Sequence, residues 1–322
     1  MRIEYPRVLL GALVCAVLVG VVVAGFTSGT AFGAYNPAWD GASELRAVAE
    51  SEGAEPQILL NTSAYALTGD DTVALVLSPE TGYNESERAR IRGFVRRGGT
   101  LVVAEDFGPH GSALLRSVGA TARVNGTLLR DERTHYRAPE LPLAEPVDEP
   151  MNRSLVEPYT EGVDELTLNY GTAVEPGNAT VVARASGFAY LDANANGQPD
   201  DAEPLRAYPV VTAESVGEGR VIVVSDPSLF INAMLDREGN RAFAGNVLAA
   251  DRVLLDYSHA GSQPPFAALL LRVRANALLQ AGVVALLVGA VVGAGRLRSI
   301  PARVVRLTTG VWGMRPQRGT DD

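Results

Sequence analysis

The chain has 322 residues, of which 47% are hydrophobic and 20% charged, a composition that excludes a disordered tail. All 28 basic residues are arginines, and the absence of lysine excludes a Walker-type phosphate loop and Schiff-base chemistry. The single cysteine, Cys15, lies in an apolar run, which excludes an internal disulfide, a thiolate zinc site and an accessible cysteine nucleophile.

Two apolar segments indicate membrane spans. Residues 8–26 carry no charge, and at about 1.5 Å per residue they cover the roughly 30 Å hydrocarbon core of a bilayer. We predict a transmembrane helix there, with an uncleaved signal anchor or a cleaved signal peptide as alternatives. Residues 276–295 are also uncharged and predict a second transmembrane helix, for which the alternative is a buried core helix.

Charge is divided unevenly along the chain. Between Thr27 and Pro265 there are 34 acidic residues and 18 arginines, whereas the two flanks hold 10 arginines and 3 acids. Because arginine accumulates on the cytoplasmic side of membrane proteins, both termini are predicted to be cytoplasmic. The predicted order is a cytoplasmic N-terminus (1–7), the first span, an extracellular domain (27–265), a juxtamembrane segment (266–275), the second span and a basic cytoplasmic tail (296–322). The arginines of the tail either contact anionic membrane lipid or only set the topology.

Several asparagines have Ser or Thr two residues later, with no proline between. This pattern predicts glycosylation and exposure to a glycosylating compartment. The candidate asparagines all lie in the acidic region: Asn61, Asn84, Asn125, Asn152 and Asn178.

The first half of the acidic region alternates helix and strand patterns, which favours an α/β fold with a parallel sheet. Helices are predicted over Ala42–Ala49, Asn84–Arg97 and Ser112–Val118, and the second opens on a capping-box pattern of Asn84 and Glu87. Strands are predicted over Gln57–Leu60, Thr72–Leu77 and Thr100–Ala104, where unbroken apolar runs are typical of strands buried on both faces.

The second half is less regular. Five prolines in Ala138–Pro158 predict a long surface excursion. Strands are then predicted over Thr180–Tyr190, Tyr208–Glu214 and Arg220–Val224, the last two joined by a hairpin turn, and a closing helix over Asn240–Leu248.

Three stretches resemble a known family: the Asn84–Arg97 helix running into Gly98–Ala104, the segment Gly219–Asn232, and Asn240–Asn246. Together they are similar to the membrane-anchored family of domain of unknown function 4350, common in halophilic archaea. The resemblance covers most of Ala34–Asp251 and implies a flavodoxin-like sheet similar to that of class I glutamine amidotransferases, with flanking helices, between the two transmembrane helices. An acidic exterior without lysine fits a high-salt environment. Glutamine amidotransferase activity is not expected, because the only cysteine lies in the first apolar run.

A calcium-binding pattern follows the predicted strand that ends at Tyr190. Its residues match the loop D-x-[DN]-x-[DN]-G-x₅-E at every specified position. Calcium takes six to eight oxygen ligands, so a structural Ca²⁺ site is predicted, with an ordinary solvated turn as the alternative. Flanking EF-hand helices are absent from the pattern. The predicted ligands are Asp192, Asn194, Asn196, Gln198 through its backbone carbonyl, Asp200 and Glu203.

A second candidate site is a ligand crevice at the carboxyl ends of the strands, where open α/β sheets bind ligands. The polar residues predicted to meet there are Ser78, Glu105, Asp106, Ser225 and Asp226. A Ser/His/Asp hydrolase built from Ser225, His110 and Asp106 is disfavoured, because no Gly-x-Ser-x-Gly pattern accompanies these residues.

These observations leave two functions open. The first is a non-enzymatic, membrane-anchored binding or scaffold module of the cell envelope. Its partners would be membrane or envelope proteins, and nucleic acid is disfavoured by the acidic charge. The family resemblance alone implies a further possibility, a subunit of an envelope complex linked to a cytoplasmic ATPase. The second is an envelope hydrolase or carbohydrate-acting enzyme that uses the carboxylates at the strand ends. A carboxylate pair in a deep pocket would favour the enzyme, and acids paired with arginine would favour the binding module.

Overall fold

A computed structural model of the chain describes residues 9, 13, 15–17, 19–20, 25, 27–148, 152–261, 265–274 and 278–282. The chain divides into two compact units, residues 1–268 and 269–322, and all the named strands lie in the first.

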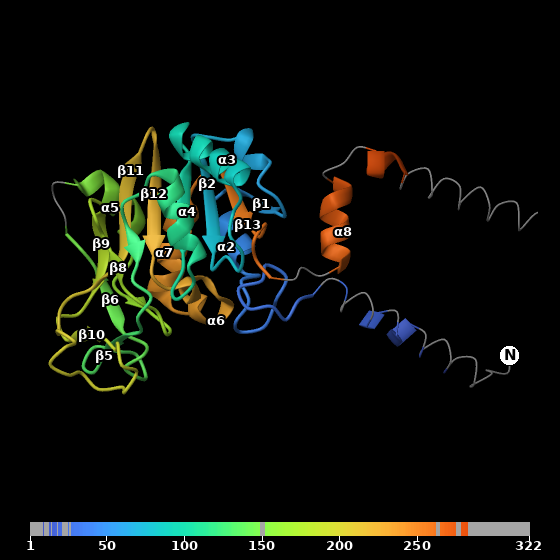
Figure 1. Cartoon of the computed structure of the whole chain (residues 1–322). Helices are drawn as coiled ribbons and strands as arrows, with labels where there is room; N and C mark the ends of the chain where they lie inside the picture. Colours follow the sequence, from blue (N-terminus) through green and yellow to red (C-terminus); the bar gives the residue numbers. More distant parts are fainter. Residues whose placement is uncertain are drawn as a thin grey trace, which may run out of the picture. The chain divides into compact units, whose positions relative to one another are not determined.

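A nine-stranded mixed sheet organises the first unit, in the order β1-β13-β2-β3-β12-β11-β9-β6-β7 (Figure 1). The first five of these strands are parallel, and the remaining four continue the sheet in antiparallel fashion. The parallel strands are β1 (Glu55–Leu59), β13 (Arg252–Asp256), β2 (Thr72–Leu77), β3 (Thr100–Ala104) and β12 (Gly219–Val224). The antiparallel strands are β11 (Pro209–Val216), β9 (Thr180–Ala185), β6 (Leu143–Pro146) and β7 (Leu166–Thr167).

Two small antiparallel pairs accompany the main sheet. They are β5 (Leu129–Asp131) with β10 (Ala189–Leu191), and β4 (Arg123–Val124) with β8 (Val174–Glu175).

Helices cover both faces of the sheet. In Figure 1, α3 (Glu85–Arg96) and α4 (His110–Val118) lie on one face, with the short 3₁₀ turn η1 (Ala64–Ala66) packed against α3. On the other face α7 (Glu238–Leu248) contacts three helices: α2 (Leu45–Ser51), α5 (Arg153–Thr160) and α6 (Asn232–Leu235). The 3₁₀ turn η3 (Pro227–Phe230) precedes α6, and α8 (Pro265–Arg274) follows the sheet in sequence.

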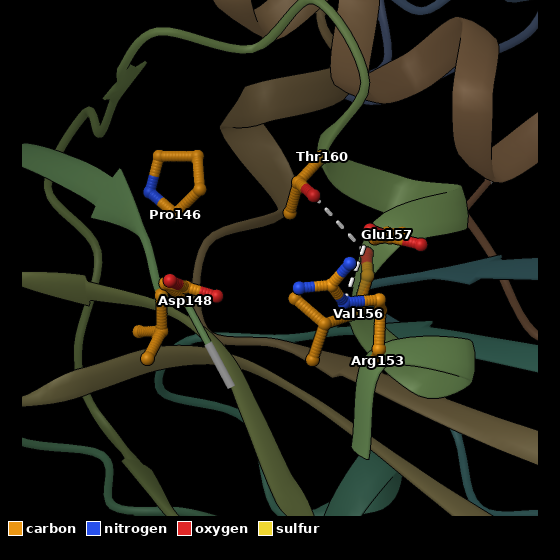
Figure 2. Close-up of a pocket in the computed structure, with 7 residues that line it drawn as sticks. Pro146, Asp148, Arg153, Val156, Glu157 and Thr160 are labelled. Carbon is orange, nitrogen blue, oxygen red and sulfur yellow. Dashed lines mark hydrogen bonds and ion pairs between the residues drawn. The ribbon is translucent and has the colours of Figure 1, made fainter. Parts of the chain in front are cut away.

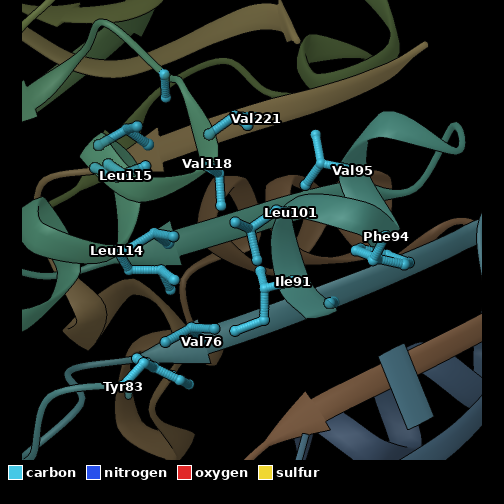
Figure 3. Close-up of a cluster of buried hydrophobic side chains, with 14 of the residues drawn as sticks. Val76, Tyr83, Ile91, Phe94, Val95, Leu101, Leu114, Leu115, Val118 and Val221 are labelled. Carbon is cyan, nitrogen blue, oxygen red and sulfur yellow. The ribbon is translucent and has the colours of Figure 1, made fainter. Parts of the chain in front are cut away.

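The core under α3 and α4 is built from apolar side chains at helical spacing. Ile91, Phe94 and Val95 of α3 are all completely buried, as the sequence pattern predicted. Figure 3 shows them beside Leu114, Leu115 and Val118 of α4, over Val76, Leu101 and Val221 of the sheet. Every residue of β2 is buried, which confirms that the unbroken apolar runs mark strands covered on both faces.

Several elements match the sequence prediction closely. The strands β2 and β3 have the predicted bounds, and α2, α3, α4, α7, β11 and β12 agree to within a few residues. The predicted excursion over Ala138–Pro158 is wrong, because residues Leu143–Pro146 form β6 inside the main sheet and α5 begins at Arg153. The predicted strand Thr180–Tyr190 is divided into β9 and β10, which belong to different sheets.

The flavodoxin-like strand order is also wrong. Numbered along the chain, the five parallel strands lie in the order 1-5-2-3-4, whereas the flavodoxin-like order is 2-1-3-4-5. The difference arises because β13, the last strand, inserts between β1 and β2. The supported fold class is therefore a mixed α/β sheet with flanking helices.

The prediction of two transmembrane helices must be corrected. No helix within the described residues is long enough and apolar enough to cross a membrane, which overturns the two-pass location with an extracellular main domain. The named helix α8, which precedes the second predicted span in sequence, covers ten described residues. It also contains Arg272 and Arg274. Most of residues 8–26 and 276–295 lie outside the described residues.

The predicted capping box at the start of α3 is confirmed and supports a stability prediction. The Glu87 backbone N–H donates to Asn84 Oδ1 at 3.1 Å, and the Asn84 N–H donates to Glu87 Oε2 at 2.8 Å. Replacing Asn84 with alanine is expected to lower the free energy of unfolding by about 1 kcal/mol, measured by urea denaturation. Ser86→Ala is the control, because it also removes the glycosylation pattern and one hydrogen bond to Asn84 Oδ1 but keeps both reciprocal bonds of the capping box. An equal loss in both variants would contradict the capping role.

Candidate functional site: the carboxyl edge of β3 and β12

The carboxyl ends of β2, β3 and β12 lie side by side in register. Leu77 pairs with Ala104, and Ala104 pairs with Val224. The next residues, Ser78, Glu105 and Ser225, therefore stand at one level of the sheet, each followed by the loop that leaves its strand. The structure thus brings the five predicted crevice residues to one edge, which we call the β3–β12 edge: Ser78, Glu105, Asp106, Ser225 and Asp226.

Connections leave this edge in opposite directions. The chain runs from β3 to α4 on one face and from β12 through α6 to α7 on the other (Figure 1). Adjacent parallel strands with this arrangement form a topological switch point, the place where α/β sheets usually bind ligands.

Glu105 is completely buried beneath the start of α4. The backbone N–H of Gly111 donates to its Oε2, while its Oε1 has no hydrogen-bond partner. A Cβ atom added at Gly108 or Gly111 would collide with a carboxylate oxygen of Glu105, so a larger residue there would displace this side chain. Burial raises the pKa of Glu105 to about 7, and the N–H groups of Gly111 and Ser112 oppose that rise.

Asp226 is also completely buried and is held by backbone N–H groups. The N–H of Ser228 donates to its Oδ1 at 2.7 Å, and the N–H of Asn169 donates to its Oδ2 at 2.6 Å. Burial raises the pKa of Asp226 to about 7 against these two hydrogen bonds, and the nearby Asp106 adds to the rise. A Cβ at Gly171 would lie 2.7 Å from Asp226 Cβ, so the 169–172 loop closes tightly over this carboxylate.

The Ser/His/Asp arrangement is not formed. Ser225 is completely buried, and its Oγ has no hydrogen-bond partner among the described residues. The backbone of Ser225 is used structurally, because its carbonyl accepts from Thr172 N–H at 3.0 Å and its N–H donates to the Val210 carbonyl at 2.9 Å. Ser225 therefore has no base to activate it as a nucleophile.

The accessible part of the edge is acidic and aromatic. Asp106 is partly exposed, and burial raises its pKa. The next residue, Phe107, is 51% exposed, and Tyr170 in the covering loop is 54% exposed. Tyr170 also has a φ of 60°, in the left-handed region that non-glycine residues rarely adopt. Within the described residues no arginine lies within ion-pair distance of Asp106.

Hollows among the described residues lie away from the predicted crevice residues. One of about 280 Å³ lies beside α5, and Figure 2 shows Pro146 and Asp148 across it from the helix. There Arg153 pairs with Glu157 at 3.3 Å, an exposed i,i+4 ion pair that contributes little. A larger hollow, of about 480 Å³, is lined by acids from β6, from the residues just before β7, and from the junction of α6 and α7. Among the described residues, the strand-end acids form no ion pair with arginine.

The predicted calcium ligands share the connection from β10 to β11. Asp192 and Glu203 are buried, whereas Asn194, Asn196 and Asp200 are exposed. Among the described residues no three His, Cys, Asp or Glu side chains converge as a metal-binding group. That finding does not exclude a calcium site in this loop, because half of the predicted ligands are amide or backbone oxygens.

The glycosylation candidates differ in their surroundings. Four are exposed: Asn61, Asn84, Asn152 and Asn178. Asn125 is partly buried, and its Nδ2 donates to Glu175 at 2.9 Å, a hydrogen bond that a glycan would break. Modification of these sites stays a prediction.

A cluster missed by the sequence analysis lies at the end of β13. Asp256 is 4% exposed, and its Oδ2 accepts hydrogen bonds from the hydroxyls of Tyr65 at 2.7 Å and Tyr83 at 3.2 Å. Beside it, His259 stacks on Tyr83 with ring centroids 3.9 Å apart and lies 3.1 Å from Glu87. The signal that could have located this cluster is the apolar run Val253–Leu255, which was not interpreted as a strand.

Comparison with known families identifies the chain. The model of the family described as domain of unknown function (DUF4350) matches residues 34–248. The chain belongs to this family. The DUF4350 region thus contains the whole sheet except β13, together with both candidate sites. No curated protein matches the chain.

Solved structures show only weak similarity. The mmIFT52 N-terminal domain is 14% identical, with a TM-score of 0.39 over 53% of this chain and 72% of that one. A cytoplasmic protein from Salmonella typhimurium LT2 is 16% identical, with a TM-score of 0.37 over 65% and 86%. An exo-β-1,4-mannosidase from Opitutaceae bacterium strain TAV5 is 18% identical, with a TM-score of 0.30 over 56% of this chain and 25% of that enzyme. These values are too low to carry an argument about activity.

Proposed function

We propose that the chain is a non-catalytic binding module that contacts a partner protein through the β3–β12 edge. The main support is that the two strand-end acids are buried and hydrogen-bonded to the backbone. Glu105 and Asp226 are completely buried, and their oxygens accept hydrogen bonds from the backbone at the starts of α4 and η3. A general acid or base must reach a substrate within about 3 Å, and neither carboxylate is open to one.

The exposed chemistry of the edge indicates the kind of partner. Phe107 and Tyr170 offer aromatic surface, which is enriched at protein interfaces, and Asp106 adds a carboxylate that forms no ion pair with any described arginine. The chain also carries a net charge of −9. Aromatic rings and a carboxylate together attract cationic side chains, so the partner is a protein segment that presents arginine or lysine.

Site-specific photo-crosslinking tests this proposal. A photoreactive amino acid would replace Phe107 or Tyr170 in the full chain, and mass spectrometry would identify the adduct in the cells that produce the protein. We expect the same partner at both positions, with a yield that falls at high salt because the attraction is electrostatic. Leu67 is the control, since it is 87% exposed but lies elsewhere, in the loop after η1. Absence of an adduct, or the same adduct from Leu67, would reject the edge as the binding surface.

One observation favours the alternative, a hydrolase that uses the strand-end carboxylates. The pKa values of Glu105 and Asp226, both about 7, are in the range in which a carboxyl group acts as a general acid near neutral pH. Such an enzyme would need the 169–172 loop to open. Turnover of aryl glycosides or aryl esters by the purified chain, abolished in Asp226→Asn, would establish this alternative.

A further inference from the structure

The connection from β10 to β11 is wrapped around the carboxylate of Asp192. The N–H of Asn196 donates to Asp192 Oδ1 and the N–H of Gly197 donates to Oδ2, each at 3.0 Å. These bonds turn the chain back on itself within six residues. The 192–203 loop therefore has an ordered backbone without a ligand, and binding a ligand there would cost little conformational entropy of the loop.

Glu203 is the observation that points to a ligand. This side chain is 5% exposed and closes the loop from its far end, because its Oε1 accepts from the N–H groups of Ala193 at 2.7 Å and Asn194 at 3.4 Å. Its second oxygen, Oε2, is buried without any hydrogen-bond partner among the described residues. An ionised carboxylate with a bare buried oxygen is costly, and a cation bound at that oxygen removes the cost.

Other oxygens of the loop keep free lone pairs. Asn194 Oδ1 accepts from the N–H of Asn196 at 3.0 Å, and Asn196 Oδ1 accepts from the N–H of Gln198 at 2.8 Å. Asp200 Oδ2 accepts from Asn194 Nδ2 at 2.6 Å, which draws positions 194 and 200 together. Each of these oxygens has a second lone pair, so each can bind a cation without losing its hydrogen bond.

Arg130 is a positive charge beside the loop, but among the described residues its ion pairs are with Glu132, Glu140 and Asp192 and not with Glu203. Its Nε lies 4.0 Å from Asp192 Oδ2 and donates to the hydroxyl of Tyr190 at 3.0 Å. Its Nη1 pairs with Glu140 at 2.5 Å. The guanidinium therefore offsets part of the charge of Asp192 and leaves the bare oxygen of Glu203 without a counter-charge.

We propose that the 192–203 loop binds one Ca²⁺ ion. The ligands are side-chain oxygens of the loop, the backbone carbonyl of Gln198 and the carboxylate of Glu203. The all-oxygen donor set, with two buried carboxylates and neutral amides, suits Ca²⁺, whereas Zn²⁺ prefers nitrogen and sulfur and Mg²⁺ retains most of its water. The side-chain ligands are Asp192, Asn194, Asn196, Asp200 and Glu203.

The ion would have a structural effect at a junction of two sheets. The loop begins directly after β10, which pairs only with β5, and the chain then enters β11 of the nine-stranded sheet. Bound Ca²⁺ therefore ties the β5–β10 pair to the main sheet. This role is independent of partner binding at the β3–β12 edge.

Calcium titration of the purified full chain, stripped with a chelator, tests the site. Calorimetry is expected to show one Ca²⁺ site that Mg²⁺ does not fill, and Ca²⁺ at 100 times its Kd should raise the Tm by about 5 °C or more. Glu203→Gln should weaken binding by about tenfold or more. Asp201→Asn removes the same charge from an exposed residue outside the ligand set and should change Kd by less than about twofold.

A second variant and a second readout keep the test decisive if Glu203→Gln fails to fold. Asn196→Ala removes an exposed side chain and one exposed hydrogen bond, so it should weaken Ca²⁺ binding while lowering the Tm of the calcium-free protein only slightly. Arg206 is the only tryptic site between residues 185 and 219, and Ca²⁺ should slow cleavage there in the wild type and not in Asn196→Ala. No binding heat, or equal weakening in Asp201→Asn and Glu203→Gln, would overturn the proposal.

Discussion

Replacing Asp256 with alanine is expected to lower the free energy of unfolding by about 3–5 kcal/mol. This carboxylate ends β13, which lies between β1 and β2 in the parallel half of the sheet, and its Oδ2 accepts from both Tyr65 and Tyr83. The two tyrosines are 0% and 3% exposed. Truncation would leave two buried hydroxyls without an acceptor, and each such group costs about 1–3 kcal/mol.

The tyrosines remain hydrogen-bond donors over a wide pH range. Burial raises the pKa of Tyr65 and Tyr83 well above the ordinary value, and the negative charge of Asp256 raises both further. The other oxygen of Asp256 accepts from the N–H of Ser258 at 2.8 Å, so the same side chain also fixes the turn after β13.

Denaturant unfolding would measure the loss, with Tyr65→Phe as the comparison. That variant keeps the ring packed edge-on against Phe94 and removes only one donor, so it should cost about 1 kcal/mol. If Asp256→Ala cost no more than Tyr65→Phe, the carboxylate would not be the shared acceptor that holds the cluster together.

Local patterns predicted the elements whose contacts are local. The helix α3 could be assigned because its cap, its apolar face and its glycine stop all lie within 16 consecutive residues. The strands β2 and β3 have nothing but apolar or β-branched residues, which marks them as buried. By contrast, β6 has a proline at its end, and prolines argue against a strand in a central position. Its pairing with β7 and β9 depends on residues far away in sequence, which no local pattern encodes.

The order of the strands in the sheet could not be predicted from local patterns either. If β13 were counted first, the parallel order would read 2-1-3-4-5, which is the flavodoxin-like order. The chain therefore reaches a familiar spatial arrangement from a different starting strand. The apolar run at Val253–Leu255 does not reveal where in the sheet this strand inserts, because each position in a parallel sheet offers similar backbone partners.

The composition of the β3–β12 edge was predictable, but its accessibility was not. Strand-end rules place Glu105 and Asp226 together without any knowledge of the covering loops. Gly108 and Gly111 lack side chains, so the backbone at the start of α4 can lie close to Glu105. Gly171 in the same way lets the 169–172 loop lie close to Asp226. The last contact joins residues about 55 positions apart in the chain, so sequence analysis had no means of foreseeing it.

Glu105→Gln is expected to remove a pH-dependent loss of stability. The pKa of Glu105 rises from 4.5 to about 7 in the folded protein, so the folded state retains a proton that the unfolded chain releases. The stabilising contribution of protonated Glu105 to the free energy of unfolding is fully present below pH 4.5. It declines as the pH rises and is lost above about pH 7. A rise of this size corresponds to roughly 3 kcal/mol, and Asp226 adds a loss of the same sign over the same range.

Glutamine keeps the shape of Glu105 and its acceptor for the Gly111 N–H but cannot ionise. The stability of the variant relative to the wild type should therefore increase by roughly 3 kcal/mol between pH 4.5 and pH 8, measured by urea unfolding at a series of pH values. Glu218→Gln, in the exposed turn between β11 and β12, should show a constant difference over that range. A constant difference for Glu105→Gln as well would mean that Glu105 ionises equally in the folded and unfolded chains.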